Sequence, residues 1–244
     1  MKGYALFDLD QTLVPWDMQL LYANWVFHHA PARRLYLLPF LLALPFAKIL
    51  GARRLKRLFL GILCGMTEGE LNEINNSFLD RYVTSEFYPE TLALFNKHLN
   101  NGECVILTSA SPCLYVEGIG ERLGASKTFC TQVKREPIMP LVPEIKINNK
   151  SHDKITALKL WLAEEGLPND LPLKHSITYT DSTADLPLIE AAEHAVLINP
   201  SDRLIQTTKE MREYEILTPS RPFNDKVEKL KYASLLLFGL YQIK

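Results

Sequence analysis

Cysteine is scarce in this chain of 244 residues, and the four that occur form no C-x-x-C pair. They are Cys64, Cys104, Cys113 and Cys130, and the six histidines likewise show no metal-ligand spacing. Scattered cysteines of this kind are typical of proteins without a zinc site or a disulfide framework. We therefore expect neither feature, and we expect the protein to belong to a reducing cytoplasm.

A G-x-S-x-G nucleophile elbow is also absent, so nothing supports serine-hydrolase chemistry. The first ten residues, MKGYALFDLD, contain two aspartates and no long apolar stretch, and they do not predict a secretory signal. The chain has 27 Lys and Arg and 28 Asp and Glu, so its formal net charge is −1. This balance argues against a nucleic-acid partner. A hydrophobic share of 47% predicts a globular fold instead.

Three short apolar segments, which we predict to be β-strands, each end in polar residues. Helical patterns separate them, as in residues 153–166, where apolar residues repeat at i, i+3 and i+7. This alternation predicts an α/β fold with a doubly wound parallel sheet, whose ligand crevice lies outside the carboxyl ends of the strands. Further strands are predicted at 195–198 and 215–218. The three segments are 4–9, 104–107 and 175–180, and their polar residues are Asp8 and Asp10, Thr108 and Ser109, and Asp181.

Residues 16–85 do not follow this alternation and show helical patterns throughout. We predict that they form a helical cap domain inserted into a catalytic core made of residues 1–15 and 86–244. Pro15 and Pro89 stand near the two junctions, and their restricted backbone suits domain boundaries.

The acidic residues Asp8, Asp10, Asp181 and Asp185 would supply the oxygen ligands that Mg2+ prefers. A single pair such as Asp8 and Asp10 is equally well explained by ordinary turn residues, with Asp185 as a helix cap. The agreement of several polar clusters favours the magnesium site, because like charges gathered in one place need a cation.

Four segments resemble, in order, the four motifs of haloacid dehalogenase (HAD) superfamily phosphatases. They are FDLDQTLV, ILTSAS, the lysine of SHDKITAL and YTDSTADLPLIEAA. The insert between the first two resembles the helical cap of the phosphoserine-phosphatase-like branch, subfamily IB. Any one motif is weak, whereas the combination is specific. The resemblance implies a Rossmannoid HAD-like core, Mg2+ as cofactor and a phosphomonoester substrate.

The resemblance also implies a role for each acidic residue. Asp8 would be the nucleophile that forms an aspartyl-phosphate, and Asp10 would be the general acid and base. Mg2+ would be held by the Asp8 carboxylate, the Asp10 main-chain carbonyl and Asp181. Asp185 would orient metal-bound water.

Substrate-binding residues follow from the same resemblance. Ser109 would bind a phosphoryl oxygen, with Thr108 as its nearest rival, and Thr12 would support the turn after the nucleophile. In the phosphoserine-phosphatase branch, an acidic residue after the first motif and a cap arginine bind an amino-acid substrate. Asp17 matches the first of these by position, and Arg57 is an unaligned candidate for the second.

Lys154 falls in the first turn of a predicted helix, with Ser151 as its N-cap, where a cation opposes the helix dipole. A helix N-terminus combined with an ammonium group is an anion site, so we predict a phosphate clamp. A solvated surface lysine is the alternative, and Lys150 is the second candidate for the clamp.

Two positions depart from the family pattern. Ala184 precedes Asp185 where the family often has Asn, and Gln11 stands where Gly is common. Because the ligating aspartates remain, we expect activity with altered substrate positioning. A catalytically weak phosphate-binding or membrane-associated protein is the alternative.

The predicted cap is unusually basic, because residues 18–67 contain seven Lys and Arg and no Asp or Glu. The rest of the chain therefore carries a net charge of −8. Within this stretch, residues 35–47 are uncharged and are interrupted by Pro39 and Pro45. The basic residues are Arg33, Arg34, Lys48, Arg53, Arg54, Lys56 and Arg57.

Thirteen uncharged residues are too few to span a bilayer, so we expect residues 35–47 to contact the surface of an anionic membrane. Burial inside the cap or in a dimer interface is the alternative, and the sequence predicts no oligomeric state. The apolar tail, residues 235–240, would either contact lipid or pack on the core.

This cap resembles that of the phosphatidylglycerophosphatase C type, a membrane-associated member of the same branch. The predicted substrate is accordingly a lipid phosphate such as phosphatidylglycerophosphate, and the predicted location is cytoplasmic, peripheral at the inner face of the membrane. The alternative is a soluble phosphatase for a small metabolite such as phosphoserine, phosphocholine or histidinol phosphate.

Overall fold

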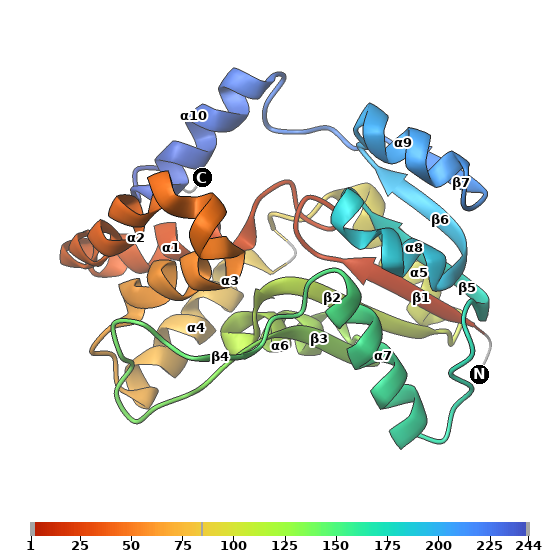
Figure 1. Cartoon of the computed structure of the whole chain (residues 1–244), viewed down its shortest axis with the longest axis horizontal. Coiled ribbons are helices and arrows are strands. Elements are labelled where there is room, and N and C mark those ends of the chain that lie inside the picture. The colour runs from red at the N-terminus through yellow and green to blue at the C-terminus, as the bar shows by residue number, and fades with distance from the viewer. Residues whose placement is uncertain (1–2, 84, 243–244) are drawn as a thin grey trace. The chain divides into compact units, whose positions relative to one another are not determined.

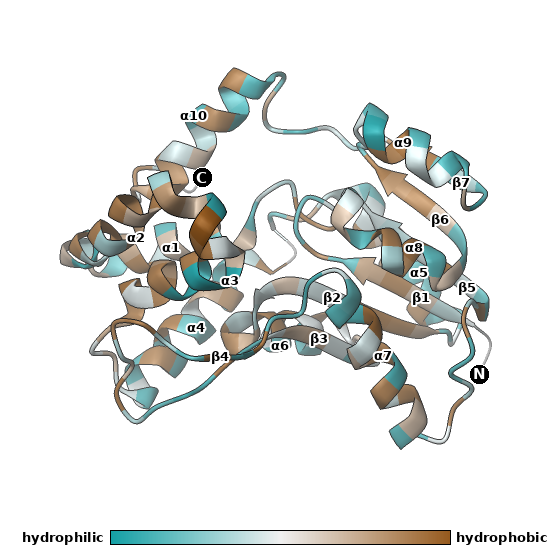
Figure 2. Ribbon diagram, viewed as in Figure 1, coloured by the Kyte–Doolittle hydropathy of each residue, from teal (hydrophilic) through white to brown (hydrophobic). Residues whose placement is uncertain are grey.

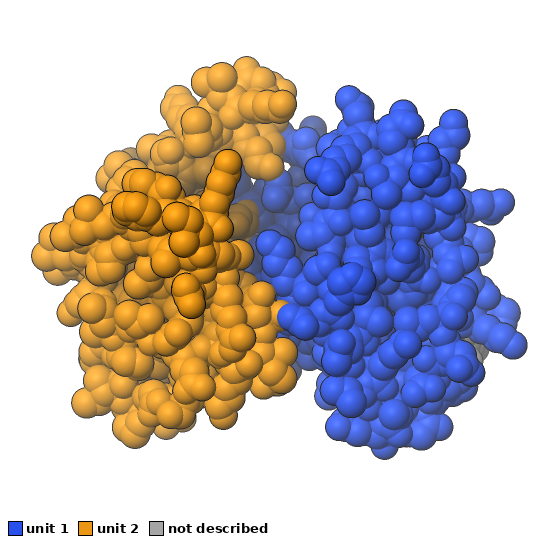
Figure 3. Space-filling view, viewed as in Figure 1, with its two compact units in different colours: residues 1–16, 83–131, 149–221 blue, residues 17–82, 132–148, 222–244 orange. Residues whose placement is uncertain are grey.

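The computed structural model describes residues 3–83 and 85–242. The chain divides into two compact units, which Figure 3 colours separately. Unit 1 comprises residues 1–16, 83–131 and 149–221, and unit 2 comprises residues 17–82, 132–148 and 222–244. Unit 2 thus contains most of the insert predicted from the sequence, together with two segments that the sequence division assigns to the core.

A seven-stranded sheet has the strand order β4-β3-β2-β1-β5-β6-β7 (Figure 1). Every neighbouring pair is parallel except β3 and β4, which are antiparallel. The doubly wound α/β class is therefore confirmed, and all five predicted strands are present. The strands are β1 Tyr4–Asp8, β2 Cys104–Pro112, β3 Lys127–Val133, β4 Ile145–Ile147, β5 Leu173–Thr180, β6 Ala192–Ile198 and β7 Tyr214–Leu217.

Helices of unit 1 cover both faces of its strands, because successive strand residues point to opposite sides. Leu6 of β1 belongs to a core cluster with Leu158 and Leu162 of α7. Phe7, the next residue, instead stacks on Tyr179 at 4.1 Å between ring centroids and packs on Phe95 of α5. The helices are α5 Pro89–Asn100, α6 Cys113–Leu123, α7 His152–Glu164, α8 Leu186–Glu190 and α9 Asp202–Lys209.

Unit 2 is mainly helical, and local signals define where its helices begin. Asp17 accepts hydrogen bonds at the first turn of α1, and Thr67 forms a capping box with Glu70 at the start of α4. Gly51 breaks the helical backbone within α3 with a φ of 75°. The helices are α1 Met18–His29, α2 Leu38–Ala43, α3 Ala47–Phe59, α4 Glu68–Tyr82 and α10 Lys226–Leu237, with 3-10 turns at Pro31–Leu37, Leu44–Phe46 and Leu60–Leu63.

One disulfide corrects the expectation drawn from cysteine spacing. Cys113 and Cys130 are bonded, with their Cα atoms 5.0 Å apart. Cys113 begins α6 directly after β2, and Cys130 lies in β3, which pairs with β2 through Pro112 and Thr131. Sheet pairing therefore brings together two cysteines that are 17 residues apart in sequence, a spacing that carries no signature of its own.

Candidate active site

The polar strand ends meet at one edge of the sheet in unit 1. Asp8 pairs with Thr108 across β1 and β2, and β1 also lies beside β5, which ends at Thr180. The chain crosses from one side of β1 to the other at this point, where open α/β sheets bind their ligands. The expectation that these clusters converge is confirmed.

Lys154 lies at the centre of this edge and is 3% exposed. Its Nζ is 2.7 Å from Oδ1 of Asp8 and 2.8 Å from Oδ1 of Asp185. The alternative of a solvated surface lysine is therefore wrong, whereas Lys150 is exposed. Ser151 occupies the N-cap position of α7, but its side chain makes no capping hydrogen bond.

Burial and the neighbouring charges shift the pKa values of Asp8 and Lys154. Burial raises the pKa of Asp8, the ammonium of Lys154 lowers it, and the carboxylates of Asp185, Asp10 and Asp181 raise it again. Burial disfavours the charged form of Lys154, but the Asp8 and Asp185 carboxylates outweigh it and raise the pKa of the lysine. Lys154 is thus a permanent cation here.

Two serine hydroxyls hold the carboxylate of Asp10. The Ser109 hydroxyl donates to Oδ2 at 2.9 Å, and the Ser111 hydroxyl donates to the same oxygen at 3.0 Å. The main-chain N–H of Ser111 donates in turn to the Ser109 hydroxyl at 2.9 Å. The hydroxyl predicted to bind a phosphoryl oxygen is therefore engaged with Asp10 here, and Asp10 is fixed in position.

The turn after β1 places Thr12 beside the first aspartate. Its hydroxyl lies 3.5 Å from Oδ2 of Asp8, and both residues are buried. Gln11 has a φ of 59°, in the left-handed region where glycine is favoured, which accounts for the glycine that is common at this position. The turn is further fixed by the N–H of Leu13, which donates to Leu9 at 2.9 Å.

Asp185 and Asp181 complete the acidic set from the segment after β5. The Thr180 hydroxyl donates to Oδ2 of Asp185 at 3.0 Å, and Asp181 contributes its charge to the field at Asp8. Ala184, the departure from the family pattern, donates its main-chain N–H to the Ser182 side chain at 3.2 Å. Ala184 therefore helps to form the turn that presents Asp185, although its side chain has no polar atom.

Asn149 is a buried residue of this edge that the sequence did not predict. Its side-chain amide donates to Thr108 Oγ1 at 3.2 Å and to the Ser109 carbonyl at 3.0 Å, while its Oδ1 has no hydrogen-bond partner. Its main-chain N–H donates to Thr131, whose hydroxyl donates to the Ala110 carbonyl at 2.6 Å. Asn149 and Thr131 thus brace the end of β2, which carries the serines that hold Asp10.

No single sequence signal identifies this brace, because Asn149 lies in the short irregular segment between β4 and α7 and meets β2 only in three dimensions. Ser111 is different, since it is the last residue of the ILTSAS motif, although the resemblance assigned it no role.

The two predicted substrate residues of the cap belong to unit 2. Asp17 accepts hydrogen bonds from the main chain of Gln19 and Leu20 and serves as a helix cap. Arg57 donates to the carbonyls of Pro143 and Val142 at 2.8 and 3.4 Å. Each therefore has a structural partner within its own unit.

The donor set fits a hard divalent cation. Four aspartates, Asp8, Asp10, Asp181 and Asp185, share this edge with a single lysine, which leaves a surplus of negative charge around the buried Asp8. The carboxylates of Asp8 and Asp181 and the main-chain carbonyl of Asp10 would hold such an ion.

A second set of side chains has the spacing of a metal site. Within residues 3–83 and 85–242, Cys113, Glu117 and Cys130 are the three metal-ligand side chains whose ligand atoms lie within 4.8 Å of one another. Its sulfurs are joined in the disulfide and are not available as thiolate ligands.

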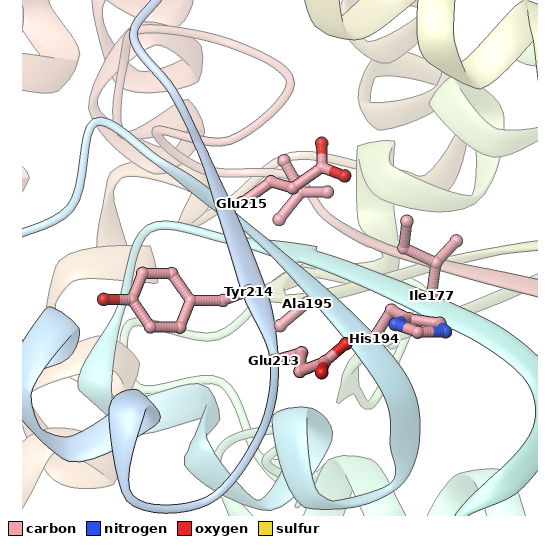
Figure 4. A pocket seen from close by; sticks show the side chains of 7 residues that line it. Ile177, His194, Ala195, Glu213, Tyr214 and Glu215 are labelled. Carbon is pink, nitrogen blue, oxygen red and sulfur yellow. The ribbon is translucent and has the colours of Figure 1, made fainter.

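A separate hollow of about 350 Å³ lies on β5, β6 and β7 (Figure 4). His194, Glu213 and Glu215 are among the side chains that line it. None of the predicted site residues belongs to this lining, so the hollow is distinct from the acidic edge.

Comparison with known proteins agrees with this geometry. A probable phosphatase of Mycobacterium tuberculosis is 28% identical to the chain over 223 residues, which cover 89% of this chain and 76% of that protein. A phosphoserine phosphatase of the same organism is 28% identical over 228 residues, which cover 88% of this chain and 70% of that protein.

The fold is also shared with a solved structure. A Bordetella pertussis protein of unknown function has a TM-score of 0.74 at 23% identity, with 88% of this chain and 99% of that one covered. The model of the haloacid dehalogenase-like hydrolases matches residues 5–190, which include β2, α7, β5 and all but the first residue of β1, with Asp8, Asp10, Asp181 and Asp185. The chain therefore belongs to the haloacid dehalogenase-like hydrolase family and is a hydrolase of the phosphatase kind.

Proposed function

We propose that the protein hydrolyses phosphomonoesters through a phosphorylated Asp8. The observation that carries this proposal is the buried contact of Asp8 with Lys154, whose ammonium also binds Asp185. A carboxylate held by a permanent cation at a strand end has the position and the charge to attack phosphorus. The same cation offsets negative charge on the phosphoryl oxygens.

In the first half of the reaction, a carboxylate oxygen of Asp8 forms a bond to phosphorus while the ester P–O bond breaks. Asp10 donates a proton to the departing alcohol oxygen. In the second half, Asp10 takes a proton from water, the water oxygen bonds to phosphorus and the bond to Asp8 breaks. Inorganic phosphate is released and Asp8 is regenerated.

The hydroxyls of Ser109 and Ser111 orient Asp10 for both proton transfers. Asn149 maintains the strand end that carries them. Mg2+, bound by Asp8, Asp181 and the Asp10 carbonyl, would reduce the repulsion between the carboxylate and the incoming phosphate.

For the substrate we propose a lipid phosphate such as phosphatidylglycerophosphate. Unit 2 supports this choice, because Leu35, Leu42 and Ile49 are 78%, 65% and 81% exposed beside a concentration of basic residues. A soluble phosphate monoester is the second candidate, which the similarity to a phosphoserine phosphatase favours. Asp17 and Arg57 would bind an amino-acid substrate only after leaving their present partners.

Assays of several phosphate monoesters in the presence of Mg2+ test both the mechanism through Asp8 and the proposed lipid substrate. Detergent-dispersed phosphatidylglycerophosphate is compared with phosphoserine, phosphocholine and histidinol phosphate by release of inorganic phosphate. We expect Asp8→Asn to reduce kcat/KM by at least ~10³-fold, with exposed Asp153→Asn as the matched control. Equal rates for Asp8→Asn and wild type would contradict the mechanism, and a higher kcat/KM for a soluble ester would contradict the lipid substrate.

A further inference from the structure

Large apolar side chains of unit 2 are exposed to solvent along one continuous stretch of the chain. Residues Pro31–Leu63 are, by length and composition, long and apolar enough to cross a membrane, and only 11% of their most apolar 18 residues is buried. A core helix of a soluble protein would be mostly buried, so this stretch is not explained by packing within the unit. The exposed residues are Leu35, Tyr36, Leu38, Leu42, Leu44, Phe46 and Ile49.

A second apolar segment lies next to this one. Arg34 donates to the carbonyls of Phe238 and Gly239 at 2.8 and 2.9 Å, and α10 packs on α1. Phe238 and Leu240, which are also exposed, are thereby joined to residues 35–49. Figure 2 shows hydrophobic residues in brown on α2, α3 and α10. Two segments far apart in sequence thus form one apolar region in unit 2.

We propose that this region is a membrane-docking surface whose occupant is a bilayer that contains anionic lipid. The docking surface is defined as the exposed apolar residues of 35–49 together with Phe238 and Leu240. The lipid-substrate part of the proposed function rests on this surface, whereas the chemistry of Asp8 does not.

The backbone favours contact with the membrane surface over a span. Pro39 and Pro45 are each the second residue of a new helical element, and Gly51 interrupts α3. The uncharged residues 35–47 would extend only about 20 Å even as one straight helix, which is less than the ~30 Å hydrocarbon thickness. A broken, partly 3-10 segment of this length lies along an interface.

The charges of unit 2 favour anionic lipid. Arg34, Arg53 and Arg57 donate hydrogen bonds to main-chain carbonyls, which are neutral and do not cancel their positive charge. Arg33 also donates to main-chain carbonyls, but after the hydrogen bonds of Thr67 its charge helps to lower the pKa of the nearby Glu70 carboxyl. Lys48 and Arg54 are exposed. A row of cations bordering an apolar segment attracts acidic headgroups while the apolar side chains enter the acyl boundary.

The same charges disfavour a second copy of this chain as the occupant. Unit 2 contains fifteen Lys and Arg against nine Asp and Glu. A symmetric dimer through this surface would bring two basic stretches without acidic residues against each other. Anionic lipid removes this repulsion, whereas a second copy would double it.

Vesicle flotation of the full chain tests the proposal, with Asp8→Asn used so that lipid turnover does not interfere. We expect binding to phosphatidylcholine vesicles with about 30% phosphatidylglycerol, weaker binding at high salt and little binding to phosphatidylcholine alone. The triple variant Leu35→Ser/Leu42→Ser/Ile49→Ser should lower the vesicle partition coefficient by roughly tenfold or more. Leu160→Ser, a 60% exposed residue of α7 in unit 1, is the matched control.

The docking proposal is overturned if the parent protein fails to float with anionic vesicles, or if the triple variant floats equally well. It is also overturned if the parent forms a dimer in solution that the triple variant loses, because a second copy then covers the surface. The same substitutions on an active Asp8 background are assayed with a soluble phosphate ester. Unchanged hydrolysis there separates failure of docking from failure of the proposed chemistry.

Discussion

The two units of this protein use charge in opposite ways. Unit 1 has twelve Lys and Arg and nineteen Asp and Glu, and it buries Lys154 between the carboxylates of Asp8 and Asp185. Unit 2 has an excess of basic residues, and four of the five arginines in its 33–57 stretch donate to neutral carbonyls. In unit 1 a buried ammonium group contacts two carboxylates, whereas in unit 2 the positive charges are distributed over the 33–57 stretch.

The difference matters because the medium sets the strength of an electrostatic interaction. A buried charge acts strongly on its immediate neighbours, since little water screens it. An exposed charge is screened within about 8 Å at physiological ionic strength and acts mainly on partners that approach the surface. Unit 1 is therefore suited to chemistry and unit 2 to recognition, and substitutions should have large effects in the first and small effects in the second.

The largest effect is expected for Lys154→Met. This substitution leaves two buried carboxylates without their cation, so the free energy of unfolding should fall by roughly 3–5 kcal/mol. Phosphatase activity should fall by at least ~10³-fold. Chemical denaturation and steady-state kinetics measure both, with Lys159→Met on the exposed face of α7 as control. If the Lys154→Met enzyme were active and of normal stability, the expected contrast between large effects in unit 1 and small effects in unit 2 would be wrong.

Removal of divalent metal should also abolish activity, but with a smaller effect on stability. Mg2+ at a hundred times its Kd should stabilise the folded protein by about 2.7 kcal/mol, because it binds the clustered carboxylates only when they are assembled. Thermal unfolding with and without Mg2+ measures this shift, and Asp181→Asn should reduce it. A shift that is the same in Asp181→Asn would exclude this aspartate as a ligand.

An intermediate effect is expected for Asn149→Ala. Loss of its bonds to Thr108 and Ser109 leaves a buried carbonyl without a donor and should cost about 1–3 kcal/mol of stability. Because Asp10 loses its support indirectly, kcat should fall more than KM rises. Asn169→Ala in an exposed loop is the control. A pure loss of stability with unchanged kcat would reduce Asn149 to a structural residue.

The smallest effect is expected for Leu42→Ser in unit 2. Leu42 is 65% exposed, so the free energy of unfolding should change by no more than about 0.5 kcal/mol. Phe27→Ala in the same unit removes a fully buried ring and should cost roughly 3–5 kcal/mol. Urea denaturation of the two variants provides the comparison. A large loss for Leu42→Ser would mean that this residue is covered in solution.

Much of unit 1 was predictable because its signals are local. β1 is an apolar run that ends in Asp8, β2 begins with the apolar run 104–107 before Thr108, and Asp181 directly follows β5; the motif order places these strands in a doubly wound sheet. The contact between Lys154 and Asp8 follows from the same motifs. By contrast, the polar residues of β3 come in adjacent pairs, which matches neither the alternating nor the continuous apolar pattern of a strand, and β4 has only three residues.

The missed features all depend on contacts between distant parts of the chain. The Cys113–Cys130 disulfide and the bonds of Asn149 to β2 arise only after the strands have paired. In the same way, Arg34 joins residues 35–49 to the C-terminal segment, a link of 204 residues that no local pattern records. Local periodicity in the sequence predicts helices and strands, whereas the disulfide and these hydrogen bonds form only when the helices and strands pack together.

The most direct test of the central claim is to trap the phosphorylated intermediate. Asp10→Asn lacks the base that activates water, so a substrate with a good leaving group, labelled with 32P, should load the enzyme but release phosphate slowly. Acid quench and peptide mapping should then place a hydroxylamine-sensitive phosphate on Asp8, and Asp8→Asn should carry none. Turnover by the wild type without a label on Asp8 at any time, or a label on another residue, would contradict the account.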